Sequence, residues 1–295
     1  MSTLVIVNRA AGHGRAARIW EQIRPVLLAR GSEYEWLETL RPGHATELAR
    51  DAVSRGFQRI IAVGGDGTVH ETVNGLAQSP VVLGVIPAGT GNDFAKTLAL
   101  PKDPSQALAA IDSGRVRRID LARANDRYYM NVAGVGFDAE VAGEANRIPK
   151  YIKGAAGYLV SIFRVLPRYS PITLRINLDG RVLEQPCLLV SAGNGRYYGG
   201  GLKICPEAVP DDGLLDVIVG GDFGKAETLA VLPRVFTGTH ITHPKVKTYR
   251  AVKVSIESPV PLLVQADGEI IGQTPVTFEL IPGALAVAGA PLPSA

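Results

Sequence analysis

The sequence predicts two domains, an N-terminal α/β domain built on a doubly wound, mostly parallel sheet and a C-terminal β-rich antiparallel sandwich. Three observations support this prediction. Strand-like and helix-like segments alternate up to about residue 117, strand-like runs follow one another after it, and Asp-Gly dipeptides punctuate the later runs. We place the domains at residues 1–122 and 123–295.

The first domain is expected to hold four strands joined by helices. The strands are expected at 4–7, 34–39, 60–63 and 81–86. Ile19, Ile23 and Leu27 space the first helix, which Pro25 should kink. Apolar residues from Ala45 to Val53 recur at i, i+3, i+4 and i+7 and predict the second helix. This alternation places ligand-binding loops at the carboxyl ends of the strands.

The stretch from Ile60 to Gly75 is the centre of this domain. An apolar strand leads into three glycines around Asp66, and a helix is expected to begin at Thr68. Glycine lets backbone N–H groups approach a ligand closely, and a helix N-terminus suits an anion, most often phosphate. The helix dipole stabilises an anion by only about 0.3–1 kcal/mol, so Asp66 is expected to recruit Mg²⁺. The alternative is a tight turn alone.

The second domain is expected to consist mainly of antiparallel strands. The predicted strands are 118–122, 128–132, 172–178, 182–191, 214–219, 252–257 and 262–265. Turn dipeptides stand at Asp179-Gly180, Asp212-Gly213 and Asp267-Gly268. Two helices, at 157–167 and 225–236, interrupt the strands.

Composition excludes several classes of protein. A formal charge of +3, from 31 basic and 28 acidic residues, is too small to indicate a nucleic-acid partner. Cys187 and Cys205 lack a Cys-x-x-Cys pairing and are expected to be buried thiols in a reducing cytosol. Neither a signal peptide nor a membrane span is apparent, so a cytoplasmic protein is expected. His240 and His243 have no partner cluster, which argues against zinc.

The predicted helix at 157–167 has two interpretations. Basic residues surround its apolar ones, which would suit peripheral contact with an anionic membrane. The basic residues are Arg147, Lys150, Lys153, Arg164 and Arg168, and the apolar ones are Tyr158, Leu159, Ile162, Phe163 and Leu166. The apolar positions run nearly all round the helix, which suits a core helix equally well.

Two ordered motifs are more specific, Gly64 to Thr68 with Asn74 and then Pro87 to Ala95. They resemble the diacylglycerol kinase catalytic-domain family, in its soluble bacterial lipid-kinase branch. Gly-Gly-Asp-Gly-Thr alone is shared with NAD kinases and the phosphofructokinase superfamily. Further matches are Asn8 to Gly12, Thr39 with Gly43 to Ala45, Arg118 to Leu121, Pro210 to Asp216, His243 to Lys245 and Asp267 to Glu269.

The resemblance implies ATP-dependent phosphorylation of a lipid hydroxyl. The residues that would contact ATP are Asn8, Arg9, Ala10, Ala11, Gly12, Thr39, Gly64, Gly65, Asp66, Gly67, Thr68, Val69, His70, Glu71, Gly89, Thr90 and Asn92. Asp66, Asp93, Asp120 and Asp267 would form the acidic network that holds a catalytic Mg²⁺, and Glu269 resembles the general base. Asp212, with the carbonyls of Val209 and Leu214, matches a structural Mg²⁺ site. Arg9 and His13 stand where the family commonly has proline and lysine.

The acceptor stays open at this point. Diacylglycerol is favoured, with phosphatidylglycerol or a sphingoid base as alternatives, and the enzyme would meet its lipid at the inner face of the membrane. A homodimer is compatible with the sequence. The competing functions are an NAD-kinase-like enzyme and a catalytically silent nucleotide- or lipid-binding regulator. A regulator would be expected to lack Asp66, Asp93 or Glu269, and the chain has all three.

Overall fold

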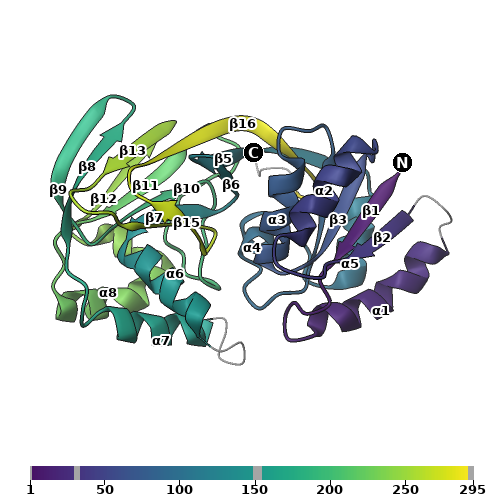
Figure 1. Ribbon diagram of the computed structural model, residues 1–295, viewed down its shortest axis with the longest axis horizontal. Helices are drawn as coiled ribbons and strands as arrows, with labels where there is room; N and C mark the ends of the chain where they lie inside the picture. Colours follow the sequence, from purple (N-terminus) through teal and green to yellow (C-terminus); the bar gives the residue numbers. More distant parts are fainter. Residues whose placement is uncertain (1, 30–33, 149–154, 292–295) are drawn as a thin grey trace. The chain divides into compact units, whose positions relative to one another are not determined.

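The computed structural model describes residues 2–29, 34–148 and 155–291 (Figure 1). The chain divides into two compact units, Met1–Ile119 with Gly283–Ala295, and Asp120–Pro282. The sequence places all of 123–295 in the second domain, whereas in the structure the chain returns to the first unit at Gly283. Two strands therefore pass from one unit to the other: β5 (Val116–Ala124) and β16 (Val276–Ala288).

The first unit contains the predicted parallel sheet. Its four strands are β1 (Thr3–Val7), β2 (Tyr34–Glu38), β3 (Arg59–Gly64) and β4 (Val82–Pro87). They pair in the order β2-β1-β3-β4, and every pair is parallel. Ala286 and Val287 of β16 add a further parallel strand beside β4. Parallel strands leave their carboxyl ends at one edge, so the loops after β1, β3 and β4 meet there.

Helices cover both faces of this sheet, as the predicted doubly wound fold requires. They are α1 (Arg15–Leu28), α2 (His44–Ser54), α3 (Asp66–Leu76), α4 (Asp93–Thr97) and α5 (Pro104–Asp112). Trp20 of α1 and Leu108 of α5 pack with Val5, Val7 and Ile61 on one face. Alternate strand residues point to the opposite face, where α2 and α3 pack against each other.

Two local expectations for the first unit need revision. The helix after the glycines begins at Asp66 rather than Thr68, because Gly65 is already the extended residue that precedes the first turn. Helix α1 includes Pro25, as expected, and the kink there stays a prediction. Helix α5 was not predicted, although its start has a clear signal. Asp103 accepts a hydrogen bond from the Gln106 N–H at 2.9 Å, and Pro104 occupies the first turn.

The second unit contains the predicted antiparallel sandwich. One sheet holds β5, β6 (Arg127–Tyr129), β8 (Ile172–Leu178), β9 (Arg181–Cys187), β13 (Lys253–Glu257) and β16. The other has the order β12-β11-β10-β7-β14-β15. Its strands are β7 (Val132–Gly136), β10 (Leu189–Gly193), β11 (Leu215–Gly220), β12 (Val246–Ala251), β14 (Leu263–Ala266) and β15 (Glu269–Gln273). Inward-facing residues such as Ile176, Val190 and Phe278 form a shared core.

The turn dipeptides have the expected geometry in two hairpins. Asp179-Gly180, between β8 and β9, has φ angles of 49° and 98°, and Asp267-Gly268, between β14 and β15, has 50° and 88°. Positive φ at both central residues is the mark of a type I′ turn. The expected strand 182–191 is instead two strands, β9 and β10, which lie in different sheets.

Three helices form a third layer on the outer face of the second sheet. They are α6 (Phe137–Arg147), α7 (Ala155–Val165) and α8 (Lys225–Thr237), at the lower left of Figure 1. Ile162 of α7 and Phe137 of α6 pack with Leu188 and Ile218 of the sheet side. An apolar cavity lies among these elements, with Leu202, Phe223 and Val235 in its lining.

The structure favours the core-helix interpretation of the segment at 157–167. Tyr158, Ile162 and Leu166 are buried, while Phe163 is 60% exposed. Arg164 and Arg168 both pair with Glu144 of α6, at 3.1 and 3.4 Å. Of the three remaining basic residues of the expected membrane patch, Arg147 is exposed at the end of α6. Lys150 and Lys153 lie outside the described residues. Among the described helices, none combines the length and apolar character needed to span a bilayer.

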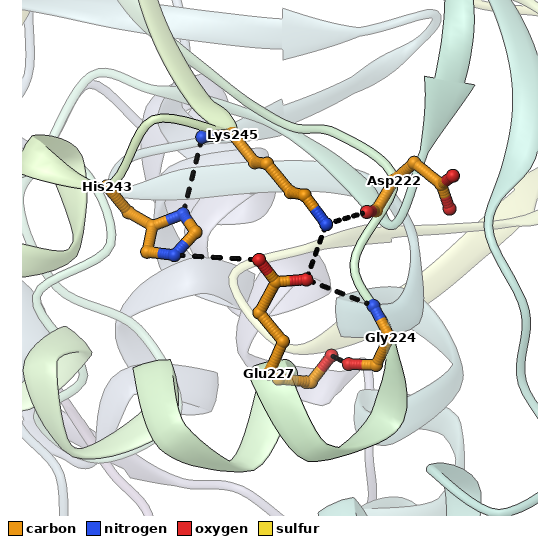
Figure 2. Close-up of polar contacts among 6 residues, drawn as sticks. Asp222, Gly224, Glu227, His243 and Lys245 are labelled. Atoms are coloured by element: carbon orange, nitrogen blue, oxygen red, sulfur yellow. Dashed lines mark hydrogen bonds and ion pairs between the residues drawn. The ribbon is translucent and has the colours of Figure 1, made fainter.

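The His243-Pro244-Lys245 motif holds the N-terminus of α8 (Figure 2). The Glu227 carboxylate accepts hydrogen bonds from Lys245 Nζ at 2.6 Å and from the Gly224 N–H at 3.3 Å, and lies 3.7 Å from His243 Nε2. Lys245 Nζ also donates to the Asp222 carbonyl at 2.7 Å. The Lys245 hydrogen bond is the largest cause that lowers the pKa of Glu227. We call these side chains the α8 clamp.

Candidate active site

Glycines bring the three loops of the first unit into backbone contact. A Cβ on Gly12, whose φ is +58°, would lie 2.1 Å from the Ala88 carbonyl oxygen. A Cβ on Gly89 would lie 2.5 Å from the Gly65 Cα. Real Cβ atoms do not approach so closely, so the loops after β1, β3 and β4 can meet only through these glycines. The predicted convergence of the three loops is confirmed.

Short polar contacts fix the same corner. Asn8 Nδ2 donates to Thr68 Oγ1 at 3.0 Å, which joins the first loop to the start of α3. Asp66 Oδ1 accepts the Phe94 N–H at 3.1 Å, which joins α3 to α4 and places Asp66 beside Asp93. The amide of Asn92 exchanges two hydrogen bonds with the backbone of Gly89, at 2.8 and 3.0 Å.

Gly67 differs from its neighbours, because intramolecular packing does not require it to be glycine. A Cβ on Gly67 would meet no atom of the described residues within 4 Å, and its φ is not in the left-handed region. Glycine inside a helix costs about 1 kcal/mol relative to alanine. The first-turn N–H groups of α3 lack helical partners. Together these features form a corner that a ligand oxygen can approach closely, which we call the phosphate corner.

A cavity beside the phosphate corner contains basic residues that sequence reasoning missed. Thr90, Gly91 and Asn92 line it from the loop after β4. Arg15, Lys96 and Lys102 bring positive charge to its wall. Lys96 Nζ lies 3.0 Å from Asp93 Oδ1, so this cation and the predicted metal-binding carboxylate are neighbours. The sequence contains one signal for this basic wall, which is that the three basic residues stand close to two of the small-residue loops.

Several residues of the expected ATP contacts have protein partners in the structure, and their contact with ATP stays a prediction. Arg9 pairs with Glu21 at 2.7 Å and Glu38 at 3.0 Å, and these hydrogen bonds raise its pKa, Glu38 contributing most. Glu71 accepts the N–H groups of Gly43 and Ala45, at 2.8 and 3.1 Å, and so caps α2. The Thr39 N–H donates to the Val7 carbonyl and extends the β1–β2 pairing. His70 is buried on α3, 3.3 Å from the Asn74 amide.

The predicted acidic pair of the β14–β15 turn has two distinct environments. The Asp267 carboxylate accepts three backbone N–H groups, from Met130 at 2.8 Å, Asn131 at 2.9 Å and Val132 at 3.2 Å. Glu269 begins β15 and is exposed, and within the described ranges its carboxylate has no hydrogen bond or ion pair. Asp267 therefore anchors the turn, while Glu269 is available to a ligand.

Hydrogen bonds of residues that sequence reasoning missed connect Asp120 to the segment that binds Asp267. Asp120 Oδ2 accepts the Gly213 N–H at 2.8 Å. Asn194 Nδ2 donates to the carbonyls of Asp120 and Met130, at 3.0 and 3.2 Å, and the Asn194 N–H donates to the Asn131 carbonyl at 2.8 Å. Both asparagines are buried. A polar amide that ends an apolar run was the available signal.

The four expected Mg²⁺ carboxylates are divided between the units. Asp66 and Asp93 belong to the first unit, and Asp120 and Asp267 to the second. Their carboxylates supply the hard oxygen ligands that Mg²⁺ prefers, so the residue types fit the ion. A single site formed by all four stays a prediction.

Asp212 of the expected structural Mg²⁺ site is bound by protein donors, and its contact with a metal stays a prediction. Asp212 Oδ1 accepts the Leu214 N–H at 3.1 Å, and Oδ2 pairs with the Arg250 guanidinium. Both carboxylate oxygens thus have protein donors. Burial raises the pKa of the neighbouring Asp216 to about 6. No cluster of three or more His, Cys, Asp or Glu able to bind a metal occurs in the described chain, and this includes the region of His240 and His243.

The two cysteines are as expected, since both are free and buried. Burial is the main cause that raises the pKa of Cys187 to about 11, which keeps it a thiol at neutral pH. Burial also lowers the pKa of His240, whose Nε2 lies 3.0 Å from the Ile204 carbonyl oxygen. These groups pack in the second unit as ordinary core residues.

Comparison with known proteins assigns both parts of the chain. Residues 2–124 match the diacylglycerol kinase catalytic domain, and residues 131–289 match the YegS C-terminal NAD kinase beta sandwich-like domain. The chain therefore belongs to the diacylglycerol kinase family. The two-domain α/β and β-sandwich architecture is the one that this family assignment requires.

Individual relatives agree over nearly their full length. A diacylglycerol kinase of Mycobacterium tuberculosis is 34% identical over 289 residues, covering 96% of this chain and 93% of that protein. One of Staphylococcus aureus is 34% identical, covering 93% and 88%. A crystal structure of a diacylglycerol kinase from Bacillus anthracis matches with a TM-score of 0.76 at 28% identity, covering 97% of this chain and 96% of that chain.

Proposed function

We propose that the protein is an ATP-dependent lipid kinase that transfers the γ-phosphate to a lipid hydroxyl, with diacylglycerol as the favoured acceptor. The observation that carries the proposal is the phosphate corner. Glycines force three loops together there, and Gly67 leaves the start of α3 open to a ligand. Its presence in a chain whose relatives are diacylglycerol kinases favours a lipid acceptor over a dinucleotide.

The residues of the first unit supply position and charge, which is most of what phosphoryl transfer requires from a protein. The N–H groups that begin α3 and the Thr68 hydroxyl donate to phosphate oxygens, and the basic wall of the adjoining cavity neutralises their charge. Asp66 and Asp93 would hold Mg²⁺. When bound, the ion neutralises charge that develops on the phosphate oxygens.

Glu269 acts on the acceptor. Its exposed carboxylate removes the proton of the lipid hydroxyl as the oxygen attacks phosphorus. Asp267, whose oxygens are occupied by three backbone donors, is a positioning residue that holds the turn on which Glu269 lies.

A substrate panel tests the proposal. Purified protein with γ-labelled ATP and Mg²⁺ is offered diacylglycerol, phosphatidylglycerol, monoacylglycerol or a sphingoid base in mixed micelles, and NAD⁺ in solution. We expect label in phosphatidic acid. Label in NADP⁺ would support the NAD-kinase alternative, and label in none of the products, with retained ATP binding, would support a silent regulator.

Glu269→Gln tests the general base. We expect turnover to fall by roughly 10²- to 10⁴-fold, with ATP affinity unchanged, because a positioned base acts on the chemical step. The matched control is Glu184→Gln on the exposed face of β9, which should leave the rate unchanged. If the Glu269 variant keeps most of its rate on the preferred lipid, another group is the base.

A further inference from the structure

Three buried polar side chains of the second unit form a connected group that the proposed chemistry does not use. They are Asp138 of α6, Ser191 of β10 and Gln265 of β14, and each is 1% exposed or less. Gln265 Nε2 and Ser191 Oγ donate to Asp138 Oδ2, at 3.4 and 3.3 Å. Such groups are costly to bury without a function in specificity or position.

The backbone of the sheet makes room for this carboxylate. A Cβ on Gly134 of β7 would lie 2.1 Å from Asp138 Oδ2. Any side chain at this position would displace the Asp138 carboxylate from Gln265. A glycine in a central strand weakens the strand, so its presence here is explained by the close approach of Asp138.

Gln265 connects this group to the turn that contains Glu269. Gln265 Oε1 accepts the Gly268 N–H at 2.9 Å. A backbone N–H can only donate, so the oxygen of the Gln265 amide must face Gly268 and its NH₂ must face Asp138. The reversed amide would set a donor against a donor at Gly268. Asp138 accepts from the NH₂ and thereby selects the productive orientation.

The two central residues of the turn are therefore held by separate contacts. Backbone N–H groups of Met130, Asn131 and Val132 hold the carboxylate of Asp267, the first of them. Gln265 holds the Gly268 N–H, which directly precedes Glu269. A hairpin turn with both anchors presents Glu269 in one position, whereas loss of the second anchor leaves the Glu269 end of the turn free to move.

We propose that Asp138 and Gln265 are positioning residues for Glu269: Asp138 orients the Gln265 amide, and Gln265 fixes the β14–β15 turn. The inference rests on the proposed function, since it concerns the base of that reaction. A displacement of a reacting group by about 1 Å costs on the order of 10²-fold in rate, so loss of this link should affect kcat more than substrate binding.

Kinetic variants test the proposal. Gln265→Met and Asp138→Ala should each lower kcat by about 10- to 100-fold and leave the KM for ATP within twofold. Asp138→Asn should restore kcat to near the native value, because its amide oxygen still accepts from Gln265. In a Glu269→Gln background, Gln265→Met should cause no further loss.

Ser191→Ala is the matched control. It removes a hydrogen bond from the same Asp138 oxygen, and Ser191 has no contact with the turn. This variant should therefore show the loss of stability that comes from weakening the buried group, while its kcat stays unchanged. Equal losses of kcat in Ser191→Ala and Asp138→Ala would assign the effect to core packing and overturn the proposal.

Hydrogen exchange supplies a readout that is independent of activity. In the full-length protein, the Gly268 amide should exchange at least about 10-fold faster in Gln265→Met and Asp138→Ala, and at the native rate in Asp138→Asn and Ser191→Ala. Native exchange in every variant would overturn the positioning role even if the kinase function holds. Faster exchange in a protein that phosphorylates no lipid would support the link and refute the proposed function. If Gln265→Met fails to fold, the comparison of Asp138→Ala with Asp138→Asn tests the proposal by itself.

Discussion

Gly67 and Gly89 lie in the same small region but are glycine for different reasons. Gly89 is glycine because its Cβ would lie 2.5 Å from the Gly65 backbone. Gly67 has no such neighbour among the described residues, so packing within the protein does not explain why this residue is glycine. The same distinction could not be drawn from the sequence, in which both are glycines of a small-residue loop.

Gly67→Ala should separate binding from stability. We expect the KM for ATP to rise by about 10-fold or more, because a methyl group occupies the path of a ligand oxygen. The free energy of unfolding should stay equal or rise by up to about 1 kcal/mol, since alanine favours a helix. Steady-state kinetics and urea unfolding measure the two effects.

Gly89→Ala is the contrasting variant. It should lower the free energy of unfolding, because its methyl group requires two loops to move apart. An ATP KM that rises in neither variant would remove the phosphate corner from the binding site.

Asp138 gives the second unit a pH-dependent stability. Burial raises its pKa from 3.8 to about 7, and the hydroxyls of Tyr158, Tyr169 and Tyr198 nearby stay protonated because burial raises their pKa values as well. The fold favours the neutral carboxyl. Its contribution to stability is therefore complete below about pH 4 and is lost as pH rises to about 7.

Asp138→Asn should remove this dependence, since an amide does not ionise. Relative to the native protein, the variant should gain stability between pH 4 and 8, by an upper bound on the order of 4 kcal/mol. Urea unfolding at several pH values measures the difference. Native and variant curves that run parallel across this range would show that Asp138 has an ordinary pKa.

At the scale of elements, the spacing of apolar residues and the turn dipeptides predicted those helices, strands and hairpins whose structure depends on the local sequence. The four parallel strands, the α1, α2 and α8 helices and the two Asp-Gly hairpins all follow from such signals. Helix α6 was not predicted, and it contains buried Asp138, whose partners lie on β10 and β14. These contacts are tertiary, so the local spacing of residues does not report them.

The residues of the candidate site also divide into those that a local motif predicts and those that it does not. The glycine loops and the Asp-Gly-Glu turn were visible as motifs, whereas Asn131, Asn194 and Gln265 were not. Asn194 binds backbone groups of Asp120, Met130 and Asn131, and Gln265 donates to the Asp138 side chain. These partners are far away in the chain, and no spacing rule reports them. Arg9 and Glu71 were matched to a ligand by motif, but the structure gives both nearby protein partners.

The α8 clamp leads to a prediction at this scale. Lys245→Met removes the ammonium that joins Glu227 to the Asp222 carbonyl (Figure 2). The clamp is partly exposed, so we expect only a small fall in melting temperature, on the order of 1–2 °C, and a smaller one in 1 M salt. Thermal unfolding with Lys247→Met as the exposed control checks this. Equal shifts in both variants would mean that the clamp adds nothing specific.

At the scale of the whole molecule, β16 gives each unit part of its stability. Val287 of β16 is buried and pairs with Leu83 in the first unit, while Leu280 of the same strand packs in the sandwich core of the second. One strand thus contributes to two cores. The chain passes between the units at Pro282-Gly283, inside this single strand.

Truncating β16 side chains should therefore destabilise the units separately. Val287→Ala should cost about 1–3 kcal/mol and speed amide exchange in β1, β3 and β4, and Leu280→Ala should do so in β7, β10 and β11 at a cost of about 2–5 kcal/mol. Hydrogen exchange with peptide resolution distinguishes the two. A uniform increase over both units in each variant would show that they open together.

The path of β16 also affects how the chain is made. The first unit is nearly complete at Ile119, yet the strand that pairs with the second edge of β4 lies after Gly283 and is synthesised last. At roughly 5–20 residues per second, a nascent chain waits on the order of ten to thirty seconds or more with the edge of β4 that faces away from β3 unpaired. An unpaired edge attracts other strands. The ribosome-bound chain is thus the form of this protein most in need of a chaperone.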